Sequence, residues 1–255
     1  MLPEPKIIES YNADGIAVIP AVLPPPLVEL LRTELEAAIE EDAVNYPDVF
    51  DKGMVHNCMV RGPKMANLLE IQTLNSYLNA CFSDTCIVYA YQSSSLPPNQ
   101  GNYGSRVHVD SPRFIPGYST NMGVMFPLDD FTEANGATYY ARGSQLVEEL
   151  PSNDDFFATA QRAYCKAGDM ILLNPRLVHA AGVNQTQTTR HALTINFCRS
   201  YMRQRFDLPR LIPQEIIDGM GKNALRLIGM NVRVPTSLDD FYLPVEQRLY
   251  KPNQG

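Results

Sequence analysis

The sequence predicts a mainly β protein with flanking helices, and two patterns along its 255 residues predict it. Before about residue 84, apolar side chains recur at helical spacing in two long segments. After it, short runs rich in β-branched and aromatic residues are separated by Gly, Asn, Pro and Asp, without intervening helices. Such spacing favours an antiparallel sandwich or barrel over a parallel α/β sheet. We expect one domain over 1–255, with a helical part at about 1–84, a β core at about 85–200 and a C-terminal covering segment at about 201–255.

The helical part contains one short strand and two helices. The turn signal Asp14-Gly15 precedes the apolar run 16–19, which we interpret as a strand. Three consecutive prolines lead into a helix over 27–41 with an apolar stripe and an acidic far face. A second helix is predicted over 65–81, and the intervening segment 45–63 is predicted to be irregular.

The β core is predicted from five runs with high strand propensity, which cover residues 86–91, 121–128, 136–141, 169–173 and 191–198. A last helix is expected over 213–228, followed by proline-punctuated coil. The elements together predict helices packed around an antiparallel core.

Composition excludes several classes of function. The net charge is −7 and basic residues are scattered along the sequence, so nucleic acid is not an expected partner. No apolar stretch reaches transmembrane length and the first residues lack a signal-peptide core, so no membrane partner is expected. Five cysteines without CxxC spacing indicate reduced thiols and a cytoplasmic protein. We expect a monomer or a homodimer.

Two histidines and one aspartate have the spacing of a metal site. His108 and Asp110 are two residues apart, so in an extended segment both side chains point to the same side. His179 follows a predicted turn and strand that could return it to the same place. Two imidazoles and one carboxylate, with the remaining positions open, are typical of non-haem Fe(II) oxygenases. An isolated HxD pair is common and often incidental, so the hypothesis depends on His179 and on Arg190, eleven residues further on.

Three segments together resemble the phytanoyl-CoA dioxygenase (PhyH-like) family. They are His108-Val109-Asp110, the run 135–145 that begins with Asn135-Gly136, and the stretch from Gly168-Asp169 through His179 to Arg190. The resemblance implies a double-stranded β-helix, a jelly-roll of the cupin-like kind. It also implies Fe(II) as the metal, 2-oxoglutarate as co-substrate and O2 as oxidant.

The resemblance assigns roles by position. His108, Asp110 and His179 would bind iron, and Arg190 would pair with the distal carboxylate of 2-oxoglutarate, which a planar guanidinium can bind through two hydrogen bonds. Further candidates for cofactor contact are Gln92, Asn121 and Thr194, and for Gln92 and Asn121 an ordinary structural role is the alternative. Thr194 or a tyrosine would replace a serine that many relatives have at the position of Ala181. The metal centre carries the chemistry, and no separate general acid or base is expected.

Candidate substrate contacts are His56, Tyr91, Arg106, Arg113 and Arg199. The arginines could recognise a carboxylate or phosphate, although surface ion pairs are their commoner role. A histidine in a polar loop such as His56 is also more often simply solvated.

The expected function is an Fe(II)/2-oxoglutarate-dependent oxygenase that hydroxylates an unactivated C–H bond of a small polar metabolite or natural-product intermediate and releases succinate and CO2. Because Asp110 retains the carboxylate, the halogenation known in one branch of these enzymes is disfavoured. Desaturation, epimerisation or cyclisation with the same cofactors are alternatives. So are a metalloenzyme that does not use 2-oxoglutarate and a non-catalytic jelly-roll that binds a metal or small ligand.

Overall fold

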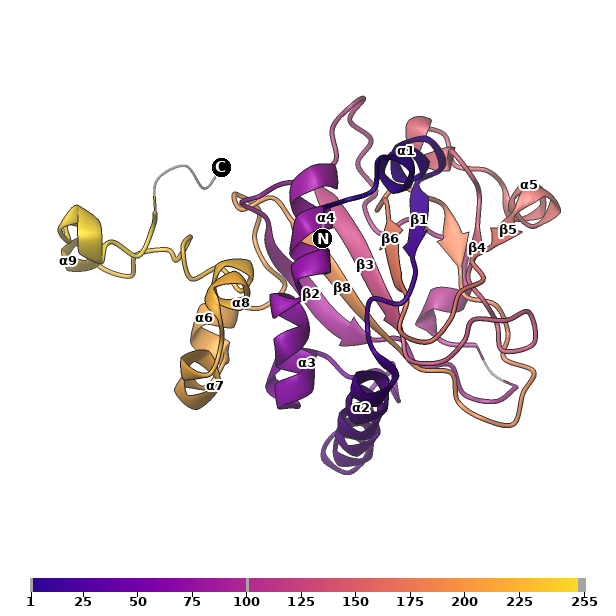
Figure 1. Ribbon diagram of the computed structural model, residues 1–255, viewed down its shortest axis with the longest axis horizontal. Helices are drawn as coiled ribbons and strands as arrows, with labels where there is room; N and C mark the ends of the chain where they lie inside the picture. The colour runs from indigo at the N-terminus through magenta and orange to yellow at the C-terminus, as the bar shows by residue number, and fades with distance from the viewer. Residues whose placement is uncertain (1, 100, 252–255) are drawn as a thin grey trace.

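Two antiparallel sheets form the centre of the computed structural model, which describes residues 2–99 and 101–251 (Figure 1). The larger sheet has the order β1-β6-β3-β8-β2 and the smaller one the order β5-β4-β7. The larger sheet consists of β1 (Ile16–Ile19), β6 (Met170–Leu173), β3 (Asn121–Pro127), β8 (Ala192–Cys198) and β2 (Ile87–Ser93). The smaller sheet consists of β5 (Gln161–Arg162), β4 (Tyr139–Tyr140) and β7 (His179–Ala180). The expected antiparallel jelly-roll core is therefore present.

Helices from the first third of the chain cover one face of the larger sheet (Figure 1). They are α1 (Pro5–Asp14), α2 (Pro25–Asn45), α3 (Pro63–Asn67) and α4 (Gln72–Cys81), with the short 3-10 turns η1 (Cys58–Val60) and η2 (Leu68–Glu70). The remaining elements are η3 (Tyr103–Ser105), η4 (Ser144–Leu146), α5 (Asn153–Thr159), α6 (Leu208–Leu211), α7 (Gln214–Asp218), α8 (Lys222–Leu227), α9 (Leu238–Phe241) and η5 (Val245–Gln247). In the described residues, no helix is both long and apolar enough to cross a membrane.

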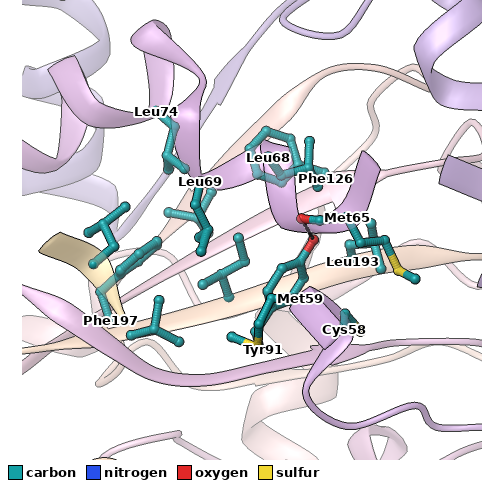
Figure 2. Close-up of a cluster of buried hydrophobic side chains, with 14 of the residues drawn as sticks. Cys58, Met59, Met65, Leu68, Leu69, Leu74, Tyr91, Phe126, Leu193 and Phe197 are labelled. Atoms are coloured by element: carbon teal, nitrogen blue, oxygen red, sulfur yellow. Dashed lines mark hydrogen bonds between the residues drawn. The ribbon is translucent and has the colours of Figure 1, made fainter. Parts of the chain in front are cut away.

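The outer face of the larger sheet, toward these helices, is apolar and closed. Alternate residues of β8 point to it, namely Leu193, Ile195 and Phe197, and all three are fully buried. Figure 2 shows this cluster, in which Tyr91 of β2 lies among Met59, Met65 and Leu69. Burial of this many apolar side chains is the main stabilising contribution to the fold.

The inner face of the same sheet, toward the smaller sheet, becomes polar along one row. Strand register places Ile171 opposite Met125, Met125 opposite Thr194, and Thr194 opposite Gln92. An isolated bridge then places Gln92 opposite His56. Directly opposed residues of antiparallel strands point to the same side, so the row passes from apolar to polar across the sheet. The polar members of the row are partly exposed.

Two predicted helices are each divided in the structure. The helix expected over 65–81 is interrupted at Ile71, whose backbone is extended, and the Asn75 side chain donates to the carbonyls of Leu69 (2.9 Å) and Ile71 (3.1 Å). The Asn75 side chain thereby supplies a partner for the Leu69 carbonyl, while the Ile71 carbonyl also accepts a hydrogen bond from the Asn75 backbone amide at 3.1 Å. The helix expected over 213–228 is divided between α7 and α8, where two glycines interrupt it.

Candidate metal centre

The structure brings His108, Asp110 and His179 together. One potential ligand atom of each lies within 4.8 Å of the other two. Asp110 Oδ1 is 3.7 Å from His108 Nε2 and 4.0 Å from His179 Nε2. The side chains are 20 %, 31 % and 12 % exposed for His108, Asp110 and His179, so the cluster is accessible without projecting into solvent. A single cation could contact all three.

Strand pairing positions the two histidines. The backbones of His108 and His179 exchange hydrogen bonds of 3.0 and 2.9 Å, so the residues are directly opposed and both rings lie on the same side. Their neighbours Val107, Val109 and Val178 point away, where they pack with Phe156 of α5. The apolar residues between the polar ones therefore fix which way the ligands face.

A backbone carbonyl holds each imidazole in one tautomer. His108 Nδ1 lies 2.7 Å from the Arg106 carbonyl, and His179 Nδ1 lies 2.9 Å from the Leu177 carbonyl. A carbonyl only accepts, so each Nδ1 carries the proton and each Nε2 has a free lone pair directed to the cluster. Burial lowers the pKa of His108, and repulsion from His179 lowers it further. A neutral imidazole is the form that binds metal.

Arg190 is a buried cation without a carboxylate partner among residues 2–99 and 101–251. Its side chain is only 1 % exposed, donates to the Gly136 carbonyl and lies over the Phe131 ring at 4.0 Å. Nε is buried and has no hydrogen-bond partner in the described part of the chain. Burial lowers the pKa of Arg190 to about 10, and Cys165 and Asp129 oppose this shift. An uncompensated buried charge is costly, so this guanidinium fits an anionic ligand.

Gly136, which supplies that carbonyl, is a position where only glycine fits. Its φ is +79°, and a Cβ there would approach the Gly182 carbonyl oxygen to 2.7 Å. The close contact between the two glycines holds the loop that begins at Asn135 against the segment after His179. The Asn-Gly pair noted in the sequence thus helps to position Arg190.

The other cofactor candidates lie on the inner face of the larger sheet. Thr194 has a buried hydroxyl that finds no hydrogen-bond partner among the described residues, so it can accept from or donate to a ligand. Gln92 Oε1 instead accepts a hydrogen bond of 2.9 Å from Arg205. Asn121 Nδ2 donates a hydrogen bond of 3.0 Å to Asn196 Oδ1, and Asn121 Oδ1 accepts one from the Thr120 hydroxyl. The side-chain amide of Asn121 is therefore engaged within the sheet, where it links β3 to β8.

The substrate candidates are distributed over several places. His56 lies beside Gln92, with Nε2 2.6 Å from Asp51 Oδ2. Arg106 and Arg113 are exposed on the segments before and after the HxD motif. Arg199 packs over the rings of Phe82 (4.5 Å) and Tyr118 (4.8 Å) and donates to the Ser119 carbonyl, contacts that suit a structural role.

The expectation that Tyr91 contacts the substrate is wrong. This residue is on the outer face of the sheet, is 1 % exposed and donates to the Met65 carbonyl at 3.0 Å, as the dashed line in Figure 2 shows. A substrate on the inner face cannot reach it. Gln92, the next residue, faces inward instead.

Sequence reasoning did not identify three residues that shape the site. Asp51 is the partner of His56, Phe131 lies under the Arg190 guanidinium, and Arg205 contacts Gln92. None has a local motif, since each reaches the site from a distant segment.

The comparisons with known proteins agree with this geometry. The family model described as "Phytanoyl-CoA dioxygenase (PhyH)" matches residues 11–192. The chain belongs to this family. An uncharacterized protein of Mycobacterium tuberculosis is 30 % identical over 260 residues, which cover 98 % of this chain and 95 % of the relative. An iron/alpha-ketoglutarate-dependent dioxygenase of Aspergillus calidoustus is 27 % identical, with coverage of 87 % of this chain and 79 % of the relative.

A solved structure confirms the fold. The non-heme alpha-ketoglutarate-dependent carbocyclase SnoK from nogalamycin biosynthesis aligns with a TM-score of 0.62 at 21 % identity, covering 83 % of this chain and 92 % of SnoK. The jelly-roll class is therefore confirmed. Family membership likewise confirms the expected class of enzyme, an Fe(II)- and 2-oxoglutarate-dependent oxygenase.

Proposed function

We propose that this member of the family hydroxylates an unactivated C–H bond of a small polar metabolite or natural-product intermediate. The observation that carries the proposal is the combination of two features. The Nε2 atoms of two histidines and a carboxylate oxygen converge where one cation could contact all three, and a buried guanidinium without a carboxylate partner in the described chain suits a dicarboxylate co-substrate.

In this proposal His108, Asp110 and His179 hold Fe(II) through Nε2, Oδ1 and Nε2. When bound, iron with 2-oxoglutarate and O2 supplies the oxidising equivalent, and succinate and CO2 are the products. The two histidines need not lose a proton to bind the metal, because their Nε2 atoms are already unprotonated. The ligands occupy one side of the site and leave the other for the co-substrate.

Arg190 and Thr194 would position the co-substrate. The guanidinium can pair its Nε and remaining N–H groups with the distal carboxylate, and the unpartnered Thr194 hydroxyl is available for a further contact. Because Arg190 is buried, the pair would form away from water, where its electrostatic attraction is strong. The Phe131 ring under the guanidinium limits its movement.

Hydroxylation is proposed over halogenation because the Asp110 carboxylate would occupy the ligand position that a halide needs. Desaturation, epimerisation and cyclisation would use the same residues, and SnoK is named a carbocyclase. A non-catalytic binding protein would not need a buried, unpaired Arg190 beside three metal ligands. The five free cysteines support a cytoplasmic location.

An anaerobic titration with Fe(II) and 2-oxoglutarate tests the proposal. A weak visible charge-transfer band near ~500 nm is expected if the keto acid chelates iron. The band should vanish in His179→Ala and persist in His191→Gln, a matched control outside the metal cluster. A metabolite panel under O2, with succinate and hydroxylated products measured by mass spectrometry, then tests the reaction. The absence of both the band and succinate would contradict the proposal.

A further inference from the structure

A large cleft lies between the segment that follows β8 and the C-terminal segment. Its volume is about 1270 Å³, and its walls come from residues within 200–210 and 229–250, together with Ile87 at the start of β2. Figure 1 shows α9 and the C-terminal segment extending beyond α6 and α8, on the side away from the smaller sheet. The cleft is larger than an ordinary metabolite requires.

Positive charge gathers in this cleft. Five arginines line it against two aspartates. The arginines are Arg203, Arg205, Arg210, Arg233 and Arg248. Such a concentration of one sign is unusual in a chain with a net charge of −7, and like charges around one cleft repel each other.

The two aspartates do not neutralise the cluster. Asp207 pairs with Arg210, three residues away. Asp240 accepts hydrogen bonds from the Thr236 amide (3.1 Å) and hydroxyl (2.8 Å) at the start of α9. Within the described residues, the other four arginines form no ion pair with a carboxylate.

These four arginines retain most of their hydrogen-bonding capacity. Arg233 donates through Nε to the Met230 carbonyl and Arg248 through Nε to the Leu243 carbonyl, each at 3.2 Å. A guanidinium has five N–H donors, so these contacts orient the group and leave its terminal nitrogens available. That arrangement suits the oxygens of a phosphate or carboxylate.

Aromatic side chains line the same cleft. Phe206, Tyr242 and Tyr250 contribute rings, and Tyr242 and Tyr250 are exposed although large and partly apolar. Rings beside arginines favour a flat apolar body that carries an anionic group.

Arg205 connects the cleft to the inner face of the larger sheet. Its amide donates to the Tyr89 carbonyl at 3.0 Å, which fixes the backbone beside β2. Its side chain lines the cleft and also donates to Gln92 Oε1 at 2.9 Å. Gln92 is in the polar row with Thr194 and His56, so Arg205 links the cleft to the polar part of the inner face.

We propose that this arginine cleft binds the anionic end of an extended substrate, a phosphate or carboxylate on a flat apolar body, while Arg205 and Gln92 direct the rest of the molecule toward the metal. Naming the ligand a substrate rests on the proposed oxygenase function. The proposal that the cleft binds an anion does not depend on that function.

Three probes of one shape test the charge requirement: 1-naphthyl phosphate, 1-naphthoate and uncharged 1-naphthol. Calorimetric titration of the full-length protein should give dissociation constants at least about tenfold lower for one or both anions than for naphthol, and the anion binding should weaken with salt. The phosphate and carboxylate arms identify the preferred group. Equal affinity for naphthol, or anion binding insensitive to salt, would overturn the proposal.

Substitutions of the cleft arginines test where the anion binds. The double variant Arg233→Gln/Arg248→Gln should weaken anion binding at least about tenfold, since two charged hydrogen-bonding groups are lost. Arg142→Gln removes the same charge from an exposed site outside the cleft and should change nothing. If the double variant does not fold by circular dichroism, Arg233→Lys/Arg248→Lys replaces it and should still weaken the anion, because lysine lacks the planar fork. Equal loss in Arg142→Gln, or no loss in the cleft variant, contradicts the assignment.

The titrations are made without added metal and repeated with Fe(II) and 2-oxoglutarate without O2. A protein that binds the anion but shows no charge-transfer band would refute the oxygenase function and leave the cleft site intact. One that shows the band but does not bind the anion would refute the cleft site alone.

Discussion

The two faces of the larger sheet are built from alternate residues of the same strands, yet they differ in polarity and in exposure to solvent. The outer face is apolar, fully buried and covered by helices (Figure 2). The inner face is apolar where Ile171, Leu173 and Ala192 are buried, and polar where it carries Thr194, Gln92 and Asn196, all partly exposed. Its buried polar atoms include the unpartnered Thr194 hydroxyl, whereas the Tyr91 hydroxyl on the outer face has its acceptor. The difference indicates that the outer face serves stability, whereas the inner face combines apolar packing with groups that are available to a ligand.

Truncation of the outer face should have the largest effect on stability. Phe197→Ala removes a fully buried ring and is expected to lower the free energy of unfolding by ~3–5 kcal/mol, because a cavity forms between sheet and helices. Urea unfolding measures this. The affinity of the remaining folded protein for 2-oxoglutarate should not change. A fall in that affinity of more than about tenfold would show that the two faces are not independent.

Arg190→Met should have the opposite profile to Phe197→Ala. It should weaken the binding of 2-oxoglutarate and leave the free energy of unfolding nearly unchanged. Loss of charge-assisted hydrogen bonds worth about 1.5–3 kcal/mol each should raise the apparent dissociation constant of 2-oxoglutarate on the order of 100-fold. Without cofactors, the free energy of unfolding should stay within ~1 kcal/mol or rise, because an unpaired buried charge is removed. Anaerobic titration and urea unfolding provide the two readouts. A large loss of stability would show that the guanidinium serves the fold.

Two single-hydroxyl variants sharpen the comparison. Tyr91→Phe removes a satisfied hydroxyl from the outer face and should cost ~1 kcal/mol of stability without altering the KM for 2-oxoglutarate. Thr194→Val removes an unsatisfied hydroxyl from the inner face, so stability should hold or improve slightly while the KM rises several-fold. Succinate assays and thermal unfolding measure both variants. If both variants changed stability and the KM for 2-oxoglutarate in the same way, the proposed difference between the two faces would be contradicted.

The smallest expected effect concerns a titratable side chain directly before β8. His191 is buried, with Nδ1 2.9 Å from Ser95 Oγ, and burial lowers its pKa. The unfolded chain therefore binds more protons below the ordinary histidine pKa of about 6.5, and stability is lost as pH falls through that range. His191→Gln should reduce the difference in unfolding free energy between pH 7.5 and 5.5 by less than about 1 kcal/mol. If this difference in unfolding free energy is the same in His191→Gln as in the unmodified protein, the pH dependence of stability comes from other titratable groups.

The strands of the larger sheet were predictable because each combines strand propensity with turn residues at both ends. In the smaller sheet, the expected run 136–141 is a strand only at Tyr139–Tyr140, and β5 and β7 were not predicted. Residues 16–19 were placed at their observed bounds, and β3 differs from its prediction by one residue. Tyr91 and Gln92 show what was missed. Neighbours in a strand face opposite sides, so alternation alone excludes one of the two from the site. Which one depends on the bulge between Val88 and Ala90, which no sequence pattern revealed.

The helices were predicted less well because their interruptions depend on tertiary contacts. Apolar spacing continues through 65–81, but Asn75 can bond to the Leu69 and Ile71 carbonyls, and Glu70 accepts a hydrogen bond from the amide of Ala224 in α8. The second interruption had a visible signal, since Gly219 and Gly221 lie inside the predicted helix. Helix α1 was not anticipated, because its first residues are polar and proline-bearing.

For the candidate site, the sequence predicted the residues with local motifs and missed those without. His108, Asp110, His179 and Arg190 have characteristic spacing in two segments. The cleft arginines are spread over more than 40 residues of the C-terminal part, and only the chain's path around the end of the sheet collects them. Scattered basic residues in a sequence therefore do not exclude a local positive site.

The carbonyl contacts of His108 and His179 have a consequence for metal selection. Because the Arg106 and Leu177 carbonyls orient both imidazoles through Nδ1, the proposed site would accept other divalent ions as well as iron. Nitrogen and oxygen ligands in an open site bind Ni²⁺, Cu²⁺ and Zn²⁺ more tightly than Fe²⁺. If His108, Asp110 and His179 are the ligands, the metal buffering of the cell, and not the site itself, would decide how much of the protein carries iron.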